Sequence, residues 1–294
     1  MGFLQRVFGG GKKVKEERAP GGVKFKVPRV DAADLSEVSD GISDIFHRRI
    51  DGIIVGNVLS EERCRAAVAK MEQWETEIMD RSAFGKVFGQ ILVASNEDLK
   101  YYMAQNESLA ADLAGIFGKS FPEVVEPVLQ QMAGGRKVMV PEHPEKGTYK
   151  GATVRFMYPG LDDIEAHVGN EFITELPQYD HLVSLLHLQD QLSYFLLLQA
   201  PTDGGELVLF DLSWDDTPRD LVEQHGITRV PAERKDFLRQ VEREELDMKA
   251  GDLIMFHGGR IWHKVNAVRG DAHRVTIGGF ASISLNDDRI YYWS

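Results

Sequence analysis

The second half of the chain alternates short β-rich runs with turns, and this feature constrains the fold most. From about residue 148 the runs are ATVRFMY, LSYFLLLQ, ELVLFD, LIMFH, IWHKVNAV and HRVTIGGFASISL, separated by Gly, Pro and Asp. Strands at such regular spacing are typical of antiparallel sandwiches and barrels. We therefore expect a mainly β fold with α additions, in which a jelly roll occupies about residues 148–294.

The N-terminal half has a helical pattern instead. Residues 51–58 read as a short buried strand, and a helix is expected to open at Ser60. Its apolar positions follow helical spacing: Cys64, Ala67, Val68, Met71, Trp74 and Ile78. Further helices are expected around 98–103, 108–117 and 122–132. This pattern predicts that about residues 23–147 form a helical support for the jelly roll.

The remaining segments complete the expected organisation. Residues 1–22 are Gly-rich and basic without the apolar stretch of a signal peptide, and they predict a flexible tail. A charged stretch, about 214–245, interrupts the β-rich runs and predicts a helical insertion or lid over an open barrel end. Residues 23–294 are then expected to form one domain.

Charge and cysteine content exclude several classes of partner. A formal net charge of -12 leaves no excess of cations for a nucleic-acid backbone, so long nucleic acids are not expected partners. No apolar run approaches the ~20 residues that span a bilayer. The single cysteine, Cys64, cannot form an internal disulfide, which favours a cytoplasmic location.

Two of the nine histidines stand out by their context. His167 follows the run ATVRFMY and a turn, and His263 lies within IWHKV. A jelly roll can bring two such strands together at its open mouth, and imidazole suits iron. Arg274 lies a short distance after His263, at the start of RVTIGGF, where its guanidinium can pair bidentately with the far carboxylate of 2-oxoglutarate. Thr276 shares the face of Arg274 and is expected to add a hydroxyl contact.

The order of these pieces matches non-haem iron oxygenases of the prolyl-hydroxylase type, with one departure. Such enzymes place a carboxylate ligand two residues after the first histidine, but here HVGNEF has Gly169 at that position. A chloride ion beside the iron would replace both the ligand and its negative charge. Asn170 or Glu171 remains an alternative third ligand, although a register shift redirects side chains in an extended segment.

Long motifs resemble the freestanding alkaloid halogenases of the hapalindole and welwitindolinone pathways: HVGNEF, DQLSYF, GGELVLF, GDLIMFHGGR, RVTIGGF and IYYWS. The resemblance implies a cupin-like double-stranded β-helix, an Fe(II) centre held by His167 and His263, a halide site at Gly169 and 2-oxoglutarate at Arg274. It also implies that Ser193 makes a hydrogen bond that favours chloride transfer over hydroxylation. Ile164 and Phe172 correspond to residues that face the substrate.

The expected enzyme is thus a halogenase of natural-product biosynthesis that uses O2, 2-oxoglutarate and chloride to chlorinate an aliphatic carbon of a small molecule by radical rebound. No carrier-protein domain is expected. Residues 81–92 correspond to a pocket-lining region of the alkaloid enzymes but differ in side chains, so the expected substrate is an alkaloid-like or nucleotide-like small molecule. Two alternatives remain: a hydroxylase with water at the Gly169 site, and a metal-free small-molecule binding protein.

Overall fold

The computed structural model describes residues 25–74, 79–95, 99–172, 176–222 and 232–294. The expected tail, residues 1–22, lies outside these ranges, as does Ile78 at the end of the expected helical face. Among the helices within the ranges, none combines the length and the apolar character that crossing a membrane requires.

Eight strands form the expected jelly roll, and they divide between two sheets. In the large sheet, β13, β10, β15 and β8 are neighbours in that order, and in the small sheet the order is β12, β11, β14, β9. The strands are β8 Thr153–Met157, β9 Ile164–His167, β10 Leu192–Gln199, β11 Leu207–Ser213, β12 Arg243–Leu246, β13 Leu253–Phe256, β14 Ile261–Val265 and β15 Arg274–Ile283. The six predicted runs all contain strands, and the fold class is confirmed.

The N-terminal half contributes more strands than the one expected at 51–58, in addition to its helices. The predicted strand at 51–58 is β2, which pairs with β13. Other short strands extend the large sheet to ten, and a separate pair forms a small ribbon. They are β1 Arg29–Asp31, β2 Gly52–Gly56, β3 Met79–Ser82, β4 Gly85–Phe88, β5 Lys137–Met139, β16 Arg289–Trp293, and the ribbon β6 Glu142–His143 with β7 Gly147–Thr148.

The predicted helices are present with shifted limits. Ser60 caps α2 by accepting a hydrogen bond from the Arg63 amide, and Cys64, Val68 and Met71 are buried on its apolar face. The two helices expected at 98–103 and 108–117 are one continuous helix. The helices are α1 Gly41–Phe46, α2 Glu61–Glu72, α3 Lys100–Phe117, α4 Phe121–Gln131, α5 Asp180–Val183 and α6 Ala232–Arg239.

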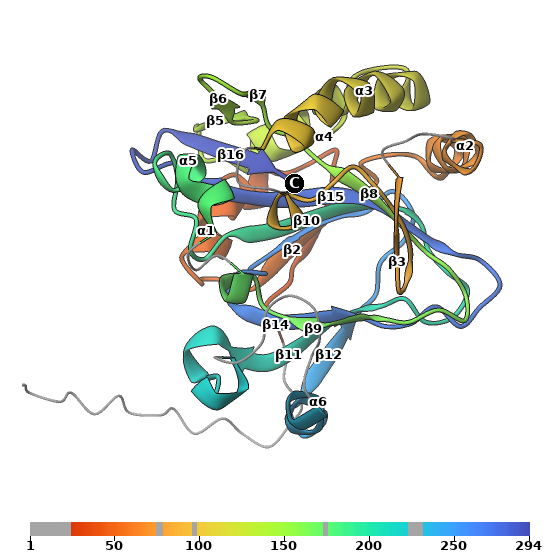
Figure 1. Cartoon of the computed structure of the whole chain (residues 1–294), viewed down its shortest axis with the longest axis vertical. Coiled ribbons are helices and arrows are strands. Elements are labelled where there is room, and N and C mark those ends of the chain that lie inside the picture. The colour runs from red at the N-terminus through yellow and green to blue at the C-terminus, as the bar shows by residue number, and fades with distance from the viewer. Residues whose placement is uncertain (1–24, 75–78, 96–98, 173–175, 223–231) are drawn as a thin grey trace, which may run out of the picture.

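The elements stack in layers around the two sheets (Figure 1). Helices α2, α3 and α4 cover the outer face of the large sheet, where Val68, Leu109 and Val125 share one apolar cluster with strand residues. The inner face of the large sheet packs on the small sheet through a second cluster that includes Leu209 and Phe256. The space between the sheets is where the jelly roll opens toward solvent, and it holds the site described below.

Residues 223–231 of the expected helical insertion at 214–245 lie outside the described ranges, and the described remainder is only partly helical. Helix α6 lies within this segment, but the last residues of the segment belong to strand β12. Strand β12 pairs with β11, and Leu246 lies opposite Leu207. Strand β12 lies at the edge of the small sheet, so most of its side chains are charged and only Leu246 is buried. The sequence REEL therefore lacks the apolar pattern by which a strand is predicted.

Helix α6 packs on the outer face of the small sheet (Figure 1). Its Leu238 belongs to an apolar cluster with Val208, Phe210 and Trp262. Near the start of the helix, the side chain of Arg234 instead lines the cavity between the two sheets. The part of the insertion that the structure describes therefore covers the sheet and also reaches the site.

His257 follows β13 as a buried histidine without a hydrogen-bond partner for either ring nitrogen. It is 2% exposed, and burial lowers its pKa to about 4 from 6.5. As the pH falls, the unfolded chain binds a proton at the ordinary pKa before the folded chain does. The folded state is therefore stable above the ordinary pKa and loses stability as the pH falls toward the folded value.

We predict that His257→Leu makes the metal-free protein less sensitive to acid. Between about pH 7 and about pH 5, the variant should lose about 2 kcal/mol less unfolding free energy than the wild type. Urea unfolding at both pH values, with a chelator present, measures this difference. Equal losses in the two proteins would show that His257 is not the source of the acid sensitivity.

Candidate active site

The two predicted histidines lie opposite each other in the small sheet. Strands β9 and β14 are antiparallel, and their register places His167 directly across from His263. Residues opposite each other in a sheet point to the same face. The centroids of the two imidazole rings are accordingly 4.3 Å apart, and both rings enter the space between the sheets.

Each imidazole is held in one tautomer by its own strand. The Nδ1 atom of His167 is 2.8 Å from the carbonyl oxygen of Glu165, and that of His263 is 2.8 Å from the carbonyl oxygen of Ile261. A carbonyl oxygen only accepts, so each Nδ1–H donates, and the lone pair is left on Nε2. Burial lowers the pKa of both rings, and each is neutral near pH 7. A neutral imidazole oriented in this way is the form that binds metals.

The side chains after Gly169 are engaged elsewhere. The Asn170 amide donates to Asp190 at 2.7 Å and accepts from the Asp190 backbone amide at 2.8 Å. Glu171 forms a buried ion pair with Arg234 at 2.5 Å. Both alternatives for a third protein ligand thus have other partners, and Glu171, although it lines the same cavity, forms no metal-binding group with the two histidines among the described residues.

The donor set fits a divalent metal bound through two imidazoles, with its other ligands supplied from outside the chain. Within the described ranges, no group of three or more His, Cys, Asp or Glu residues is placed to hold a metal ion. Imidazole suits iron, zinc and copper alike, so the two histidines alone do not select the metal.

Gly169 lies where its backbone closely approaches a glycine turn. Its amide donates to the Gly258 carbonyl at 2.8 Å. A Cβ atom at this position would lie 3.0 Å from Gly259 Cα, 3.1 Å from Gln191 Nε2 and 3.2 Å from the Gly258 oxygen. A larger residue therefore needs small shifts of the turn or of the Gln191 side chain.

A cavity of about 410 Å³ surrounds the two histidines, and most of its wall is apolar. Six of the predicted site residues line it: Ile164, His167, Gly169, Phe172, Ser193 and His263. The Phe172 ring lies 5.9 Å from the His167 ring, between centroids. Residues 81–92, which were expected to line the pocket, contribute Ser82, Phe84, Val87 and Ile91.

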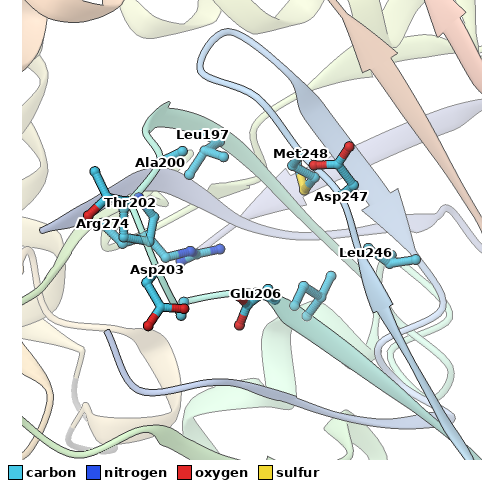
Figure 2. A pocket seen from close by; sticks show the side chains of 13 residues that line it. Leu197, Ala200, Thr202, Asp203, Glu206, Leu246, Asp247, Met248 and Arg274 are labelled. Carbon is cyan, nitrogen blue, oxygen red and sulfur yellow. The ribbon is translucent and has the colours of Figure 1, made fainter. Parts of the chain in front are cut away.

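Arg274 borders a second, smaller cavity of about 220 Å³ instead. Figure 2 shows its side chain near Thr202, Asp203 and Glu206, with Asp247 across the space. Arg274 is 4% exposed, and its guanidinium carbon lies 4.9 Å from the centre of the Phe195 ring.

No carboxylate in the described part of the chain forms an ion pair with Arg274. Burial and the nearby charge of Arg155 lower its pKa to about 9. Thr276 is buried two residues further along the same strand face, but it lines neither cavity. The structure thus separates these two residues from the wall of the histidine cavity.

Arg155 and Gln191 are site residues that the sequence analysis missed. Arg155 lies opposite Thr276 in the register of β8 and β15, and it lines the histidine cavity. It has no hydrogen-bond or ion-pair partner among the described residues, and its charge helps to lower the pKa of His167 and His263. A charged residue inside the apolar run ATVRFMY is the signal by which the sequence marks it.

Solved structures with a similar fold include an N-substituted L-amino acid dioxygenase from Burkholderia ambifaria AMMD, with a TM-score of 0.51 at 14% identity over 86% of this chain and 91% of that chain. The carbocyclase SnoK from nogalamycin biosynthesis has a TM-score of 0.48 at 14% identity over 89% of each chain. A Pseudomonas putida prolyl-4-hydroxylase has a TM-score of 0.40 at 15% identity over 84% of this chain and 97% of that chain. The first similarity shows the fold alone.

A search among curated proteins finds no match to the chain. The family model of the carrier-protein-independent halogenase WelO5, in contrast, matches residues 25–294. This match spans nearly the whole chain and includes both histidines and Gly169. The chain therefore belongs to the WelO5 family of carrier-protein-independent halogenases, which act on a free substrate.

Proposed function

We propose that this halogenase depends on iron(II) and 2-oxoglutarate, and that it uses oxygen and chloride to chlorinate an unactivated aliphatic C–H bond of a small molecule. One observation carries the proposal. Two neutral imidazoles face each other beside Gly169, where oxygenases of this type have a carboxylate ligand. A chloride from solution can take the place of that ligand and restore its single negative charge.

The Nε2 atoms of His167 and His263 would hold the iron. The hydrogen bonds from each Nδ1–H to a backbone carbonyl orient both rings before metal binds, so metal binding requires little rearrangement of these side chains. When bound, iron supplies the one-electron chemistry with oxygen that attack on an unactivated C–H bond needs.

Arg274 would hold the far carboxylate of 2-oxoglutarate. Its guanidinium is buried and feels the charge of Glu206, but it forms no direct ion pair with a carboxylate among the described residues, so a dicarboxylate would supply the bidentate pair that it lacks. Thr276 lies on the same strand face and would add its hydroxyl. Arg155, opposite Thr276, extends this cationic surface into the histidine cavity.

The cavity residues would orient the substrate and control the outcome. The Ser193 hydroxyl lines the cavity and has no hydrogen-bond partner in the described part of the chain, so it can donate beside the metal. Ile164 and Phe172 would contact the substrate, and the mainly apolar wall would exclude water from the reacting carbon.

We also propose that residues 23–294 act as one domain in the cytoplasm. The pairing of the N-terminal strand β2 with β13 supports the first part. The second part rests on Cys64, which is buried and free and cannot form a disulfide within the chain.

The mass of the product tests the proposal. With chloride, iron, 2-oxoglutarate and oxygen, the wild type should add chlorine to its substrate, which gives the chlorine isotope doublet. Gly169→Asp should lose chlorination because the new carboxylate fills the halide position, at the cost of small shifts around Gly259. If the wild type only adds oxygen in chloride-rich buffer, or if the variant still chlorinates at full rate, the proposal is wrong.

Arg274→Ala should weaken 2-oxoglutarate binding by about 1.5–3 kcal/mol, because it removes a charge-assisted pair. Anaerobic titration of the iron-loaded protein measures this loss through the visible band that appears when iron and 2-oxoglutarate bind together. Arg65→Ala is a suitable control, because Arg65 pairs with Glu61 on the exposed face of α2 and neither residue lines a cavity of the site. An unchanged 2-oxoglutarate affinity in Arg274→Ala would remove Arg274 from the site.

Ser193→Ala should shift the product ratio from chlorination toward hydroxylation without a large change in the total amount of product. The hydroxyl is small and unpaired, so its loss leaves the fold and the histidines in place. Chromatography with mass detection gives the ratio directly. A ratio equal to that of the wild type would show that Ser193 is only a wall residue.

A further inference from the structure

Gln191 places an uncommitted amide next to Gly169. The residue immediately precedes β10, is 2% exposed, and lines the histidine cavity. Its Nε2 atom lies 3.1 Å from the point where a side chain on Gly169 would begin. The amide therefore borders the space that a carboxylate ligand would occupy.

The backbone amides and the side chains next to Gly169 in the sequence already have partners. The backbone amide of Gly169 donates to the Gly258 carbonyl at 2.8 Å, and that of Asn170 donates to the Gly259 carbonyl at 2.9 Å. The side chains of the two residues after Gly169 are bound to Asp190 and Arg234, as described above. Two other donors without a partner among the described residues, Ser193 and Arg155, line the same cavity, but of the three only the Gln191 amide is among the atoms nearest to a side chain built on Gly169.

The Gln191 side chain also lacks the partners that a buried amide normally has. Its Oε1 atom is buried without a hydrogen bond, and no hydrogen bond from Nε2 to another described residue is present. Buried polar groups in native proteins are nearly always paired, and an unpaired one lowers stability. An unpaired, buried amide beside a metal site indicates that its hydrogen-bond partner is a bound ligand.

We infer that Gln191 is the halide-binding residue, whose Nε2–H donates to the chloride at the Gly169 position. The inference rests on the proposed function and extends it to a protein contact for the anion. An N–H donor stabilises a small halide more than a large one, because the smaller ion has the higher charge density. Gln191 should therefore favour chloride over bromide.

This role differs from the one proposed for Ser193. Gln191 would act on how tightly the halide binds, whereas Ser193 would act on which group the substrate carbon receives. Chloride affinity and product ratio are separate measurements, so the two residues can be distinguished.

The test is an anaerobic chloride titration of the enzyme loaded with iron(II) and 2-oxoglutarate, followed by the visible charge-transfer band. Gln191→Met keeps the size of the side chain but removes the donor, and Gln191→Glu replaces the amide with a repelling carboxylate. Both should raise the chloride dissociation constant about tenfold or more. The bromide dissociation constant of Gln191→Met should rise less, and the 2-oxoglutarate affinity should stay unchanged.

Gln199→Met is the matched control. Gln199 is the last residue of β10, the strand that Gln191 precedes. Its side-chain amide donates to the His273 carbonyl at 2.9 Å, and it lines neither cavity. Its chloride affinity should equal that of the wild type. The melting temperature of metal-free Gln191→Met provides a second measurement, and it should not fall, because the substitution removes an unpaired buried amide.

The outcomes separate this inference from the proposed function. If the wild type responds to chloride and both Gln191 variants respond with the same affinity, Gln191 does not bind the halide. A lowered melting temperature together with unchanged chloride affinity would make Gln191 a structural residue and overturn the inference. If the wild type itself shows no response to chloride, the proposed function fails first.

Discussion

The site depends on the register between β9 and β14. Because the two strands pair with His167 opposite His263, two imidazoles from distant parts of the sequence share one face of the small sheet. The carbonyl two residues earlier in each strand then holds each ring in the tautomer that leaves Nε2 free. A slip of one residue would turn one imidazole to the opposite face. The strand pairing itself thus builds the metal-binding geometry.

The two sheets divide the remaining tasks. The small sheet supplies the histidines, and the large sheet supplies Ser193, Arg155 and Arg274 from three adjacent strands. Helices on the outer face of the large sheet and α6 on that of the small sheet bury the backs of these strands (Figure 1). With both outer faces covered, the inner faces can keep an apolar cavity and unpaired polar groups between them.

The sequence predicts this architecture where strands are continuous apolar runs buried in the core, and it fails where a strand carries few buried side chains. The run LSYFLLLQ is β10 itself, but REEL is an edge strand with one buried side chain and reads as part of a helical insertion. Histidine spacing and the glycine in HVGNEF point to the centre of the site. The charge of Arg155 inside an apolar run is a signal in the sequence, but only the packing of the two sheets shows that its side chain and that of Gln191 enter a cavity. The sequence likewise does not show that Arg274 lines the smaller cavity and not the cavity around the histidines.

The central claim is that the chain leaves one metal position open for an anion from solution. A crystal structure of the enzyme loaded anaerobically with iron, 2-oxoglutarate and bromide tests it most directly, because bromide scatters anomalously. The claim predicts an anomalous peak bonded to the metal beside Gly169, with His167 and His263 as the protein ligands. A side-chain oxygen of this chain bonded to the metal at that position would contradict it.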